Sequence, residues 1–336
     1  MSKTPVAVLG AGSWGTALAI QYARAGSQVR LWGRDTAQLE AMSAARCNER
    51  YLPEGPFPDG LSIASSMAEA VDGAVEVLVS VPSHALRDCL TALRDVLQGA
   101  PGISWATKGL ELSSGRLPHE VVAEVLGDTY RCAVLSGPTF AKELARGLPT
   151  ALTVASSDKD FAAEIAARVS DEHFRAYTSD DVVGVEVGGA IKNVMAIGAG
   201  LSDGLGFGSN TRVAFITRGL SEMSRFGLAR GARAETFMGL AGMGDLVLTC
   251  TDDQSRNRRM GLALARGLTV KEAEAEIQQV VEGVLAARAV YEAAQAANIE
   301  MPITEQIYRI IYDGMEPMQA VRALMNRAPG AEFTTS

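Results

Sequence analysis

The sequence predicts an α/β domain built on a parallel sheet, followed by an all-α domain. Short apolar runs alternate with helical patterns up to about Thr178, as in successive βαβ units. Beyond that point the strand signals stop and only helical patterns remain. A chain of 336 residues also has room for two domains of about 150 residues each. We expect the first domain to span residues 1–179 and the second residues 180–336.

In the first domain, strands are expected wherever a short apolar run is bounded by turn-forming residues. These runs are 6–9, 28–32, 61–64, 75–81, 103–107, 132–135, 151–154 and 174–177. Apolar residues at helical spacing mark intervening segments such as 16–25 and 85–97. The segment 47–60 contains Pro53, Pro56 and Pro58, and we expect it to be an ordered loop.

In the second domain, only helices are expected. Their apolar residues recur every three or four positions. The helical segments are 185–201, 210–226, 256–266, 271–277, 283–297, 304–312 and 317–325. From Pro329 onward the chain is expected to be a frayed tail.

Composition limits the classes of partner. The chain carries 39 acidic and 31 basic residues, a net charge of −8, so nucleic acid is not an expected partner. The four cysteines lie far apart, without the spacing of a metal site, and are expected to be reduced thiols. We find no run of about 18 apolar residues, and the N-terminal apolar run is too short for a signal peptide. A cytoplasmic protein without a membrane span is expected.

A glycine-rich turn follows the first predicted strand. The residues Gly10-Ala11-Gly12-Ser13-Trp14-Gly15 fit the pattern G-x-G-x-x-G and open a predicted helix. In that context Gly10 permits a tight turn, Gly12 lets the backbone approach a pyrophosphate, and Gly15 lets the helix pack closely on the strand. The phosphates would lie at the positive end of the helix dipole. This segment predicts a Rossmann-type dinucleotide site, and the alternative is a turn that only packs.

The end of the second strand bears on the choice of dinucleotide. An acidic residue usually holds the ribose hydroxyl of NAD there, but this chain has Gly33, followed by Arg34 and then Asp35. A guanidinium in place of a carboxylate favours a 2′-phosphate, and therefore NADP. In the alternative, Arg34 is solvated and Asp35 turns inward to serve NAD.

Two lysines are candidates for chemistry on a carbonyl group. Lys108 directly follows an apolar strand, where a side chain can face the cofactor, although it could also be a solvated loop lysine. Lys192 interrupts a nearly uncharged helical stretch, and apolar surroundings lower the pKa of a lysine toward the range of an acid–base catalyst. The alternative is a lysine whose head group reaches solvent from a packed helix. The histidines His84, His119 and His173 are weaker candidates.

Two further segments of the helical half carry polar groups of interest. The stretch 239–245 is too glycine-rich for a stable helix, and its Asp245 could orient a lysine or a substrate hydroxyl. Farther along, Ser255 is a credible N-cap that places Arg256 and Asn257 in a first helical turn. Helix-terminal amides and a guanidinium together make a phosphate site. The alternative is a capped helix with solvated arginines.

Together these segments resemble the bacterial-type soluble NAD(P)-dependent glycerol-3-phosphate dehydrogenases, from Val6 to about Arg327. The glycine turn is shared by many dehydrogenases, whereas the last three motifs in combination are specific to this family. The motifs are GAGSWGTALA (10–19), LWGRD (31–35), VPSHALR (81–87), TKGLE (107–111), SGPTFAKE (136–143), VEVGGAIKN (185–193), GMGDLVLTCTDDQSRNRRMG (242–261) and VVEGV (280–284).

The resemblance implies reversible reduction of dihydroxyacetone phosphate to sn-glycerol 3-phosphate, a precursor of glycerophospholipids. It implies that Lys192 is the proton donor and acceptor, with Lys108 and Asp245 beside it. The cofactor, NADP in preference to NAD, would contact Gly10, Gly12, Ser13, Trp14, Gly15, Arg34, Lys108, Ala141, Arg256, Val280 and Glu282. The substrate would contact Lys108, Gly137, Thr139, Lys192, Asp245, Ser255, Arg256 and Asn257. No metal is expected, and family members are often homodimers.

Two other functions stay open at this point. One is a different two-domain NADP-dependent reductase, acting on a small hydroxy or keto acid such as ketopantoate. The other is an NADP-binding sensor without chemistry, which would leave the uncharged helix around Lys192 unexplained.

Overall fold

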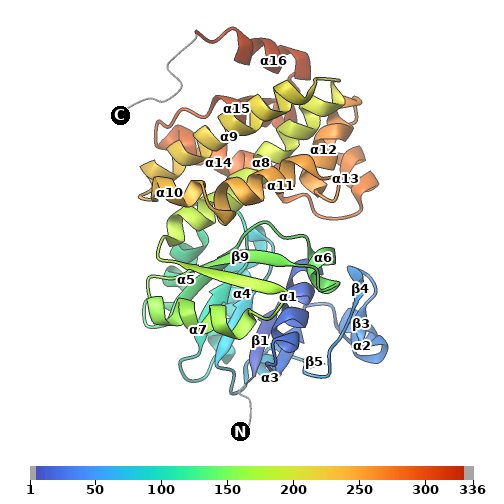
Figure 1. The fold of residues 1–336 in the computed structure, drawn as a ribbon, viewed down its shortest axis with the longest axis vertical. Coiled ribbons are helices and arrows are strands. Elements are labelled where there is room, and N and C mark those ends of the chain that lie inside the picture. Colours follow the sequence, from blue (N-terminus) through green and yellow to red (C-terminus); the bar gives the residue numbers. More distant parts are fainter. Residues whose placement is uncertain (1–4, 329–336) are drawn as a thin grey trace.

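The first domain is a sheet covered by helices on both faces, as the computed structural model of residues 5–328 shows (Figure 1). The sheet has eight strands in the order β10-β9-β8-β7-β6-β1-β2-β5, and all eight predicted strands are present. Their bounds are β1 (Val6–Leu9), β2 (Val29–Trp32), β5 (Leu61–Ile63), β6 (Glu76–Val79), β7 (Gly102–Trp105), β8 (Cys132–Ser136), β9 (Thr150–Ala155) and β10 (Phe174–Ser179).

Alternation along the strands builds a core on each face of the sheet. Val6 and Val8 of β1 join a buried cluster beneath one set of helices, while Ala7 and Leu9 join a cluster on the opposite face. Helices α1 (Ser13–Arg24), α2 (Thr36–Ala45), α6 (Ala141–Ala145) and α7 (Lys159–Val169) contribute to the first cluster. Helices α3 (Met67–Val71), α4 (Leu86–Val96) and α5 (Pro118–Leu126) contribute to the second, with the short 3₁₀ turn η1 (Ser83–Ala85) ahead of α4.

The strand order reverses between β1 and β6. The chain passes from β1 outward to β2 and β5, then returns to β6 on the other side of β1. Ligands of open α/β sheets bind beyond the carboxyl ends of the strands at such a reversal. The glycine turn at Gly10 therefore lies where a dinucleotide is expected.

Two strands, β9 and β10, depart from the expected parallel sheet. β9 runs antiparallel to β8, and β10 then runs parallel to β9. The connection from β8 to β9 contains only the five-residue helix α6, which packs on α1 rather than crossing back over the sheet. A parallel return needs a full crossover connection, so the chain re-enters the sheet in the opposite direction.

The segment 47–60, expected to be a loop, contains a small hairpin. Strands β3 (Cys47–Asn48) and β4 (Leu52–Pro56) pair antiparallel outside the main sheet. The two prolines at Pro53 and Pro56 are tolerated because β4 pairs with a single two-residue neighbour. The tail expected from Pro329 lies outside the described residues.

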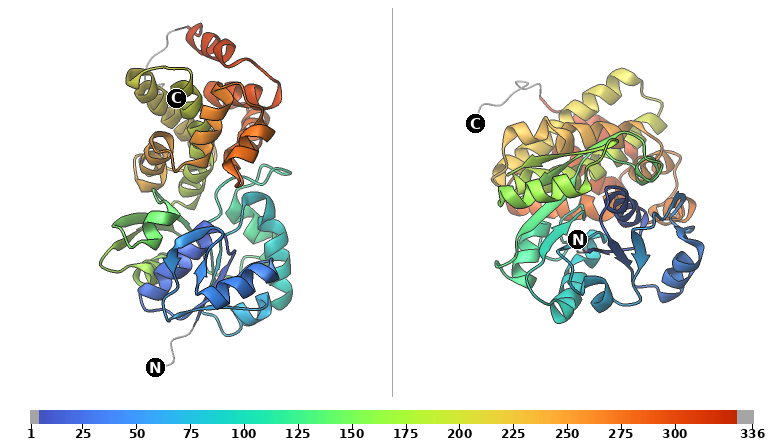
Figure 2. Two further views of the ribbon diagram at one scale, coloured as in Figure 1. Left: turned by 90° about the vertical axis from the view of Figure 1, so that its right-hand side faces the viewer. Right: turned by 60° about the horizontal axis from the view of Figure 1, so that its bottom comes forward.

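The second domain is all-helical, as expected, and packs around α8 (Val182–Gly204). Figures 1 and 2 show these helices gathered at one end of the molecule, apart from the sheet. The other helices are α9 (Ser209–Ala229), α10 (Ala234–Phe237), α11 (Asp245–Thr251), α12 (Arg256–Ala265), α13 (Val270–Ile277), α14 (Glu282–Ala296), α15 (Pro302–Tyr312) and α16 (Pro317–Met325).

Helix α8 is apolar because it is the core of its domain. Among the described residues it is the one helix long and apolar enough to cross a membrane by length and composition. However, 89% of its apolar window is buried inside the protein. Glycines let its neighbours approach closely, since a Cβ at Gly200 would lie 2.0 Å from the carbonyl oxygen of Arg258.

The glycine-rich stretch 239–245 is helical, contrary to expectation. Leu240–Gly244 forms a single π-helical turn, η2, that runs directly into α11. Tertiary packing outweighs the poor helix propensity of glycine here, because the turn lies against α8, where a Cβ at Gly188 would lie 2.2 Å from the carbonyl oxygen of Ala241. Isolated π-turns of this kind occur frequently at functional sites.

Candidate active site

A carboxylate shared by two lysines forms the centre of the site. Lys108 lies three residues beyond the end of β7, Lys192 lies midway along α8, and Asp245 begins α11. Asp245 Oδ1 is 2.6 Å from Lys192 Nζ, and Asp245 Oδ2 is 2.8 Å from Lys108 Nζ. The structure thus brings together the three residues for which chemistry was predicted.

Burial sets the charge states of this cluster. Lys192 is 7% exposed and Asp245 only 1%. Burial lowers the pKa of Lys192 to about 8; the negative charge of Asp245 opposes this shift and the positive charge of Lys108 adds to it. Burial alone would raise the pKa of Asp245, but the two ammonium groups outweigh it and hold that pKa below its usual value. Lys192 is therefore poised to gain or lose a proton near neutral pH.

Thr249 is a member of this cluster that the sequence analysis missed. Its Oγ1 donates to the carbonyl oxygen of Asp245 at 2.6 Å and accepts from Lys192 Nζ at 3.1 Å. The four-residue spacing from Asp245 places both side chains on one face of α11. That spacing was the available signal, but α11 itself was not predicted.

Helix α12 presents its N-terminus beside the lysines. Ser255 is its N-cap, as predicted, and its hydroxyl accepts from the amide of Arg258 at 3.2 Å. Arg256 is the first helical residue, and its charge lies close enough to Glu282 to oppose the rise in the pKa of that carboxyl caused by burial. The charges of Lys108 and Lys192 act on Glu282 in the same way. These residues therefore face one region.

The Asn257 side chain is engaged within the protein. Its Nδ2 donates to Asn193 Oδ1 at 2.8 Å, and its Oδ1 accepts from the amide of Gly283 at 2.8 Å. Both asparagines are buried, at 8% and 4% exposure. The chain of hydrogen bonds links α8, α12 and the start of α14, and Asn193 is a second residue that the sequence analysis missed.

The glycine turn has the form that a dinucleotide requires. A Cβ at Gly10, whose φ is +123°, would lie 2.2 Å from the carbonyl oxygen of Ser80, and a Cβ at Gly15 would lie 1.9 Å from that of Gly10. In contrast, a Cβ at Gly12 would meet nothing within 4 Å. The backbone is thus tightly packed at two glycines and open at the middle one, where a pyrophosphate would approach.

Neighbouring groups at this turn leave hydrogen-bonding capacity for a ligand. Helix α1 begins at Ser13, and its N-cap Gly12 supplies no side-chain cap. The indole Nε1 of Trp14 is buried without a hydrogen-bond partner among the described residues. The residues present therefore fit a dinucleotide cofactor.

The residue directly after β2 is a glycine, and the next acidic residue, Asp35, is engaged within the protein. A Cβ at Gly33 would lie 2.8 Å from the Cβ of Ala11, which leaves little room for an acidic side chain at that position. Asp35 is the N-cap of α2, accepting from the amide of Gln38 at 3.1 Å, and it also pairs with Arg50 at 3.3 Å. The side chain of Arg34 is exposed.

The other residues predicted for the site differ in how closely they contact the cluster and in how exposed they are. The carbonyl oxygen of Gly137 is 3.4 Å from Lys108 Nζ and accepts from Thr139 Oγ1 at 3.3 Å, so both residues adjoin the cluster. Ala141 begins α6. Val280 is 49% exposed, in the segment just before α14.

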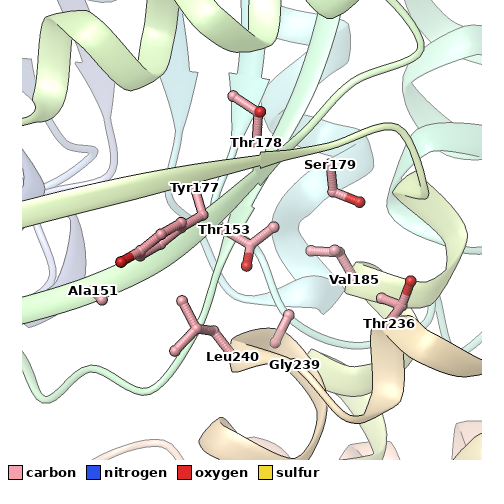
Figure 3. A pocket seen from close by; sticks show the side chains of 10 residues that line it. Ala151, Thr153, Tyr177, Thr178, Ser179, Val185, Thr236, Gly239 and Leu240 are labelled. Atoms are coloured by element: carbon pink, nitrogen blue, oxygen red, sulfur yellow. The ribbon is translucent and has the colours of Figure 1, made fainter.

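A surface hollow of about 420 Å³ has no residue of this cluster in its lining (Figure 3). It lies between β9, β10 and the start of the η2 turn, and it is lined mostly by small, hydroxyl-bearing and apolar side chains, without a lysine or a carboxylate. The candidate site is therefore defined by the ion cluster and not by the hollow.

A dinucleotide turn at the strand reversal, together with a buried lysine–carboxylate cluster formed by the sheet domain and the helical domain, defines a two-domain nicotinamide-dependent dehydrogenase. Two family models match the chain: NAD-dependent glycerol-3-phosphate dehydrogenase N-terminus over residues 5–162, and C-terminus over residues 181–322. The chain belongs to the NAD-dependent glycerol-3-phosphate dehydrogenase family.

Relatives agree with this assignment over the whole chain. Glycerol-3-phosphate dehydrogenase [NAD(P)+] of Thioalkalivibrio sulfidiphilus is 55% identical over 99% of this chain and 100% of its own length. The enzyme of that name from Pseudoalteromonas translucida is 53% identical over 98% of this chain and 99% of its own length.

Solved structures agree as well. The crystal structure of glycerol-3-phosphate dehydrogenase from Coxiella burnetii matches with a TM-score of 0.94 and 47% identity, covering 97% of this chain and 99% of that one. A ketopantoate reductase from Ralstonia eutropha matches with a TM-score of 0.61 at 18% identity, over 94% of this chain and 99% of that one. That second likeness shows a shared fold alone.

Proposed function

We propose that this protein is an NAD(P)-dependent sn-glycerol-3-phosphate dehydrogenase that reversibly reduces dihydroxyacetone phosphate. The observation that carries the proposal is the buried Lys192 on the carboxylate of Asp245, beside the N-terminus of α12. Such a cluster suits a substrate with a reacting carbonyl at one end and a phosphate at the other.

Lys192 acts as the general acid of the reduction and the general base of the oxidation. When bound, the nicotinamide supplies the hydride or receives it. Two hydrogen bonds of Lys192 Nζ, to Asp245 Oδ1 and Thr249 Oγ1, fix the direction of the ammonium group. An ammonium carries three hydrogens, so one is left for the oxygen of the substrate. A lysine with a pKa of about 8 exchanges that proton readily at cellular pH.

Lys108 and α12 hold the substrate. Lys108 adds positive charge beside the oxygen that becomes an alkoxide. The first-turn amides of α12 and the guanidinium of Arg256 bind the phosphate, with Gly137, Thr139, Ser255 and Asn257 completing the site. Binding energy from the phosphate, which does not react, positions the carbonyl.

We also propose that NADP is preferred over NAD. Asp35 is engaged by the start of α2 and by Arg50, whereas Arg34 is exposed at the end of β2. The cofactor would further contact the turn from Gly10 to Gly15, together with Lys108, Ala141, Arg256, Val280 and Glu282.

The metabolic role of the enzyme follows from its product. The product is the backbone of glycerophospholipids, so we assign the enzyme to phospholipid synthesis in the cytoplasm.

We propose a homodimer joined through the helical domain, where α9 leaves Val213 and Leu228 63% and 50% exposed. The domain boundary falls between β10, which ends at Ser179, and α8, which begins at Val182.

The decisive experiment follows oxidation of NADPH with a panel of ketones. We expect turnover with dihydroxyacetone phosphate and little with dihydroxyacetone or ketopantoate. Turnover of an α-keto acid instead would identify another reductase. Cofactor binding without turnover of any ketone would identify a sensor.

A further inference from the structure

Glu186 is a buried carboxylate that the proposed mechanism does not use. It lies in the second turn of α8, and its side chain is completely shielded from solvent. Burying a carboxylate is costly unless hydrogen bonds and a countercharge replace the lost water. The groups that hydrogen-bond to Glu186 therefore indicate which parts of the protein it holds in place.

All the partners of Glu186 belong to the other domain. Its Oε1 accepts from Trp105 Nε1 at 2.8 Å and from the amide of His119 at 2.9 Å. Its Oε2 pairs with His119 Nδ1. Trp105 is the last residue of β7, and His119 lies in the first turn of α5. One carboxylate thus joins the central helix of the second domain to a strand and a helix of the first.

Two of the three elements that Glu186 joins, β7 and α8, position the two lysines. Lys108 lies three residues beyond Trp105 on the chain leaving β7, and Lys192 lies six residues beyond Glu186 on α8. At the helical rise of about 1.5 Å per residue, Glu186 and Lys192 are separated by about 9 Å along the axis. β7 and α8 are therefore linked at two places. Glu186 links them directly through Trp105, and Asp245 links them through Lys108 and Lys192.

We propose that Glu186 is a positioning residue for the reaction: by anchoring Trp105 of β7 to α8, it sets the separation of Lys108 and Lys192 and thus how Asp245 is shared between them. This inference rests on the proposed function. A shift of about 1 Å in such a cluster is enough to cost on the order of 100-fold in rate.

Glu222 provides a matched comparison. It is also a buried carboxylate, 2% exposed, and it also accepts three hydrogen bonds, from the amides of Ile303 and Thr304 and from Thr304 Oγ1. These partners lie within the helical domain, at the start of α15. Glu222 stabilises one domain, whereas Glu186 connects two.

The test compares Glu186→Ala, Glu186→Gln and Glu222→Ala by kcat, by the pH profile of reduction, and by thermal unfolding. We expect Glu186→Ala to lose on the order of 10- to 100-fold in kcat and to shift the apparent pKa assigned to Lys192. Glu186→Gln should recover most of this loss, since an amide oxygen still accepts from Trp105 and an amide NH₂ can donate to neutral His119. Glu222→Ala should lower the melting temperature and leave kcat and the profile unchanged.

A destabilised Glu186→Ala with the wild-type kcat and pH profile would overturn the proposal. If that variant does not fold, Trp105→Phe decides, because it removes the indole donor while an aromatic ring stays in the core and His119 still bonds to Glu186: we expect a several-fold loss of kcat with a shifted profile, and an unchanged profile would overturn the inference. Failure of the proposed function is a separate result, because the wild-type enzyme would then not turn over dihydroxyacetone phosphate.

Discussion

Asp245 Oδ1 lies 2.6 Å from Lys192 Nζ, and the two side chains are only 1% and 9% exposed. The pair is not a simple buried ion pair, because Asp245 Oδ2 is also 2.8 Å from Lys108 Nζ. One carboxylate therefore faces two ammonium groups, which leaves the cluster with an excess positive charge. Such an excess of positive charge suits a site that binds a phosphorylated substrate and stabilises the negative charge that develops on its carbonyl oxygen.

The pH dependence of the two directions should be opposite. Reduction needs Lys192 protonated, and its pKa is about 8, so kcat/KM for dihydroxyacetone phosphate should be level below pH 8 and fall above it. Oxidation of glycerol 3-phosphate needs the neutral amine, so its kcat/KM should rise with pH up to about 8.

The variant Asp245→Asn tests the direction in which Asp245 shifts the pKa of Lys192. The carboxylate of Asp245 raises the pKa of Lys192, so its removal should move the falling limb of the reduction profile to lower pH. Initial rates across a buffer series of constant ionic strength measure both profiles. A limb that moved to higher pH would contradict this account of the cluster.

Loss of the Lys192 side chain should affect the chemical step above all. We expect Lys192→Ala to fold normally and to lose on the order of 10²–10⁴ in kcat, the usual contribution of general acid–base catalysis. Lys159→Ala, at a lysine whose side chain is 82% exposed, is the matched control and should retain full activity. Steady-state kinetics with circular dichroism would check both, and a near wild-type kcat would remove Lys192 from the mechanism.

The choice of cofactor should depend on Arg34. If its guanidinium binds the 2′-phosphate, Arg34→Ala should raise KM for NADPH far more than KM for NADH, because only NADPH carries that phosphate. Arg94→Ala, an exposed arginine of α4, should change neither value. Equal losses with both cofactors would show that Arg34 does not recognise the phosphate.

Short sequence patterns predicted those parts of the candidate site that lie within a single segment of the chain. The turn from Gly10 to Gly15 and the charge of Lys192 in a nearly uncharged helical stretch could be found because glycine spacing and helical periodicity are encoded over a few residues. The N-cap at Ser255 was found for the same reason, and the structure has it.

Contacts between distant segments could not be found in this way. The link from Asn193 through Asn257 to Gly283 joins three helices far apart in sequence. Thr249 was missed because α11 continues from the η2 turn, whose glycines disfavour a helix and which is stabilised by packing against the distant helix α8 at Gly188. The antiparallel return of β9 likewise depends on where α6 packs.

Recognition of the phosphate decides the substrate class, and Arg256→Lys tests it. Ser255 caps α12, so first-turn amides remain free to meet an anion, and Arg256 can add two parallel hydrogen bonds. A lysine at position 256 keeps the charge but lacks the planar fork, so the substitution should not be silent.

We expect Arg256→Lys to weaken turnover of dihydroxyacetone phosphate markedly and to leave that of dihydroxyacetone, already a poor substrate, almost unchanged. Hydrogen bonds to charged groups contribute about 1.5–3 kcal/mol each, so kcat/KM should fall about tenfold or more for each bond lost. The comparison needs a fixed ionic strength, because a long-range attraction would fade with salt whereas a direct contact is screened much less. Equal losses with both substrates would mean that Arg256 supports the fold or the cofactor, and that the phosphate is bound elsewhere.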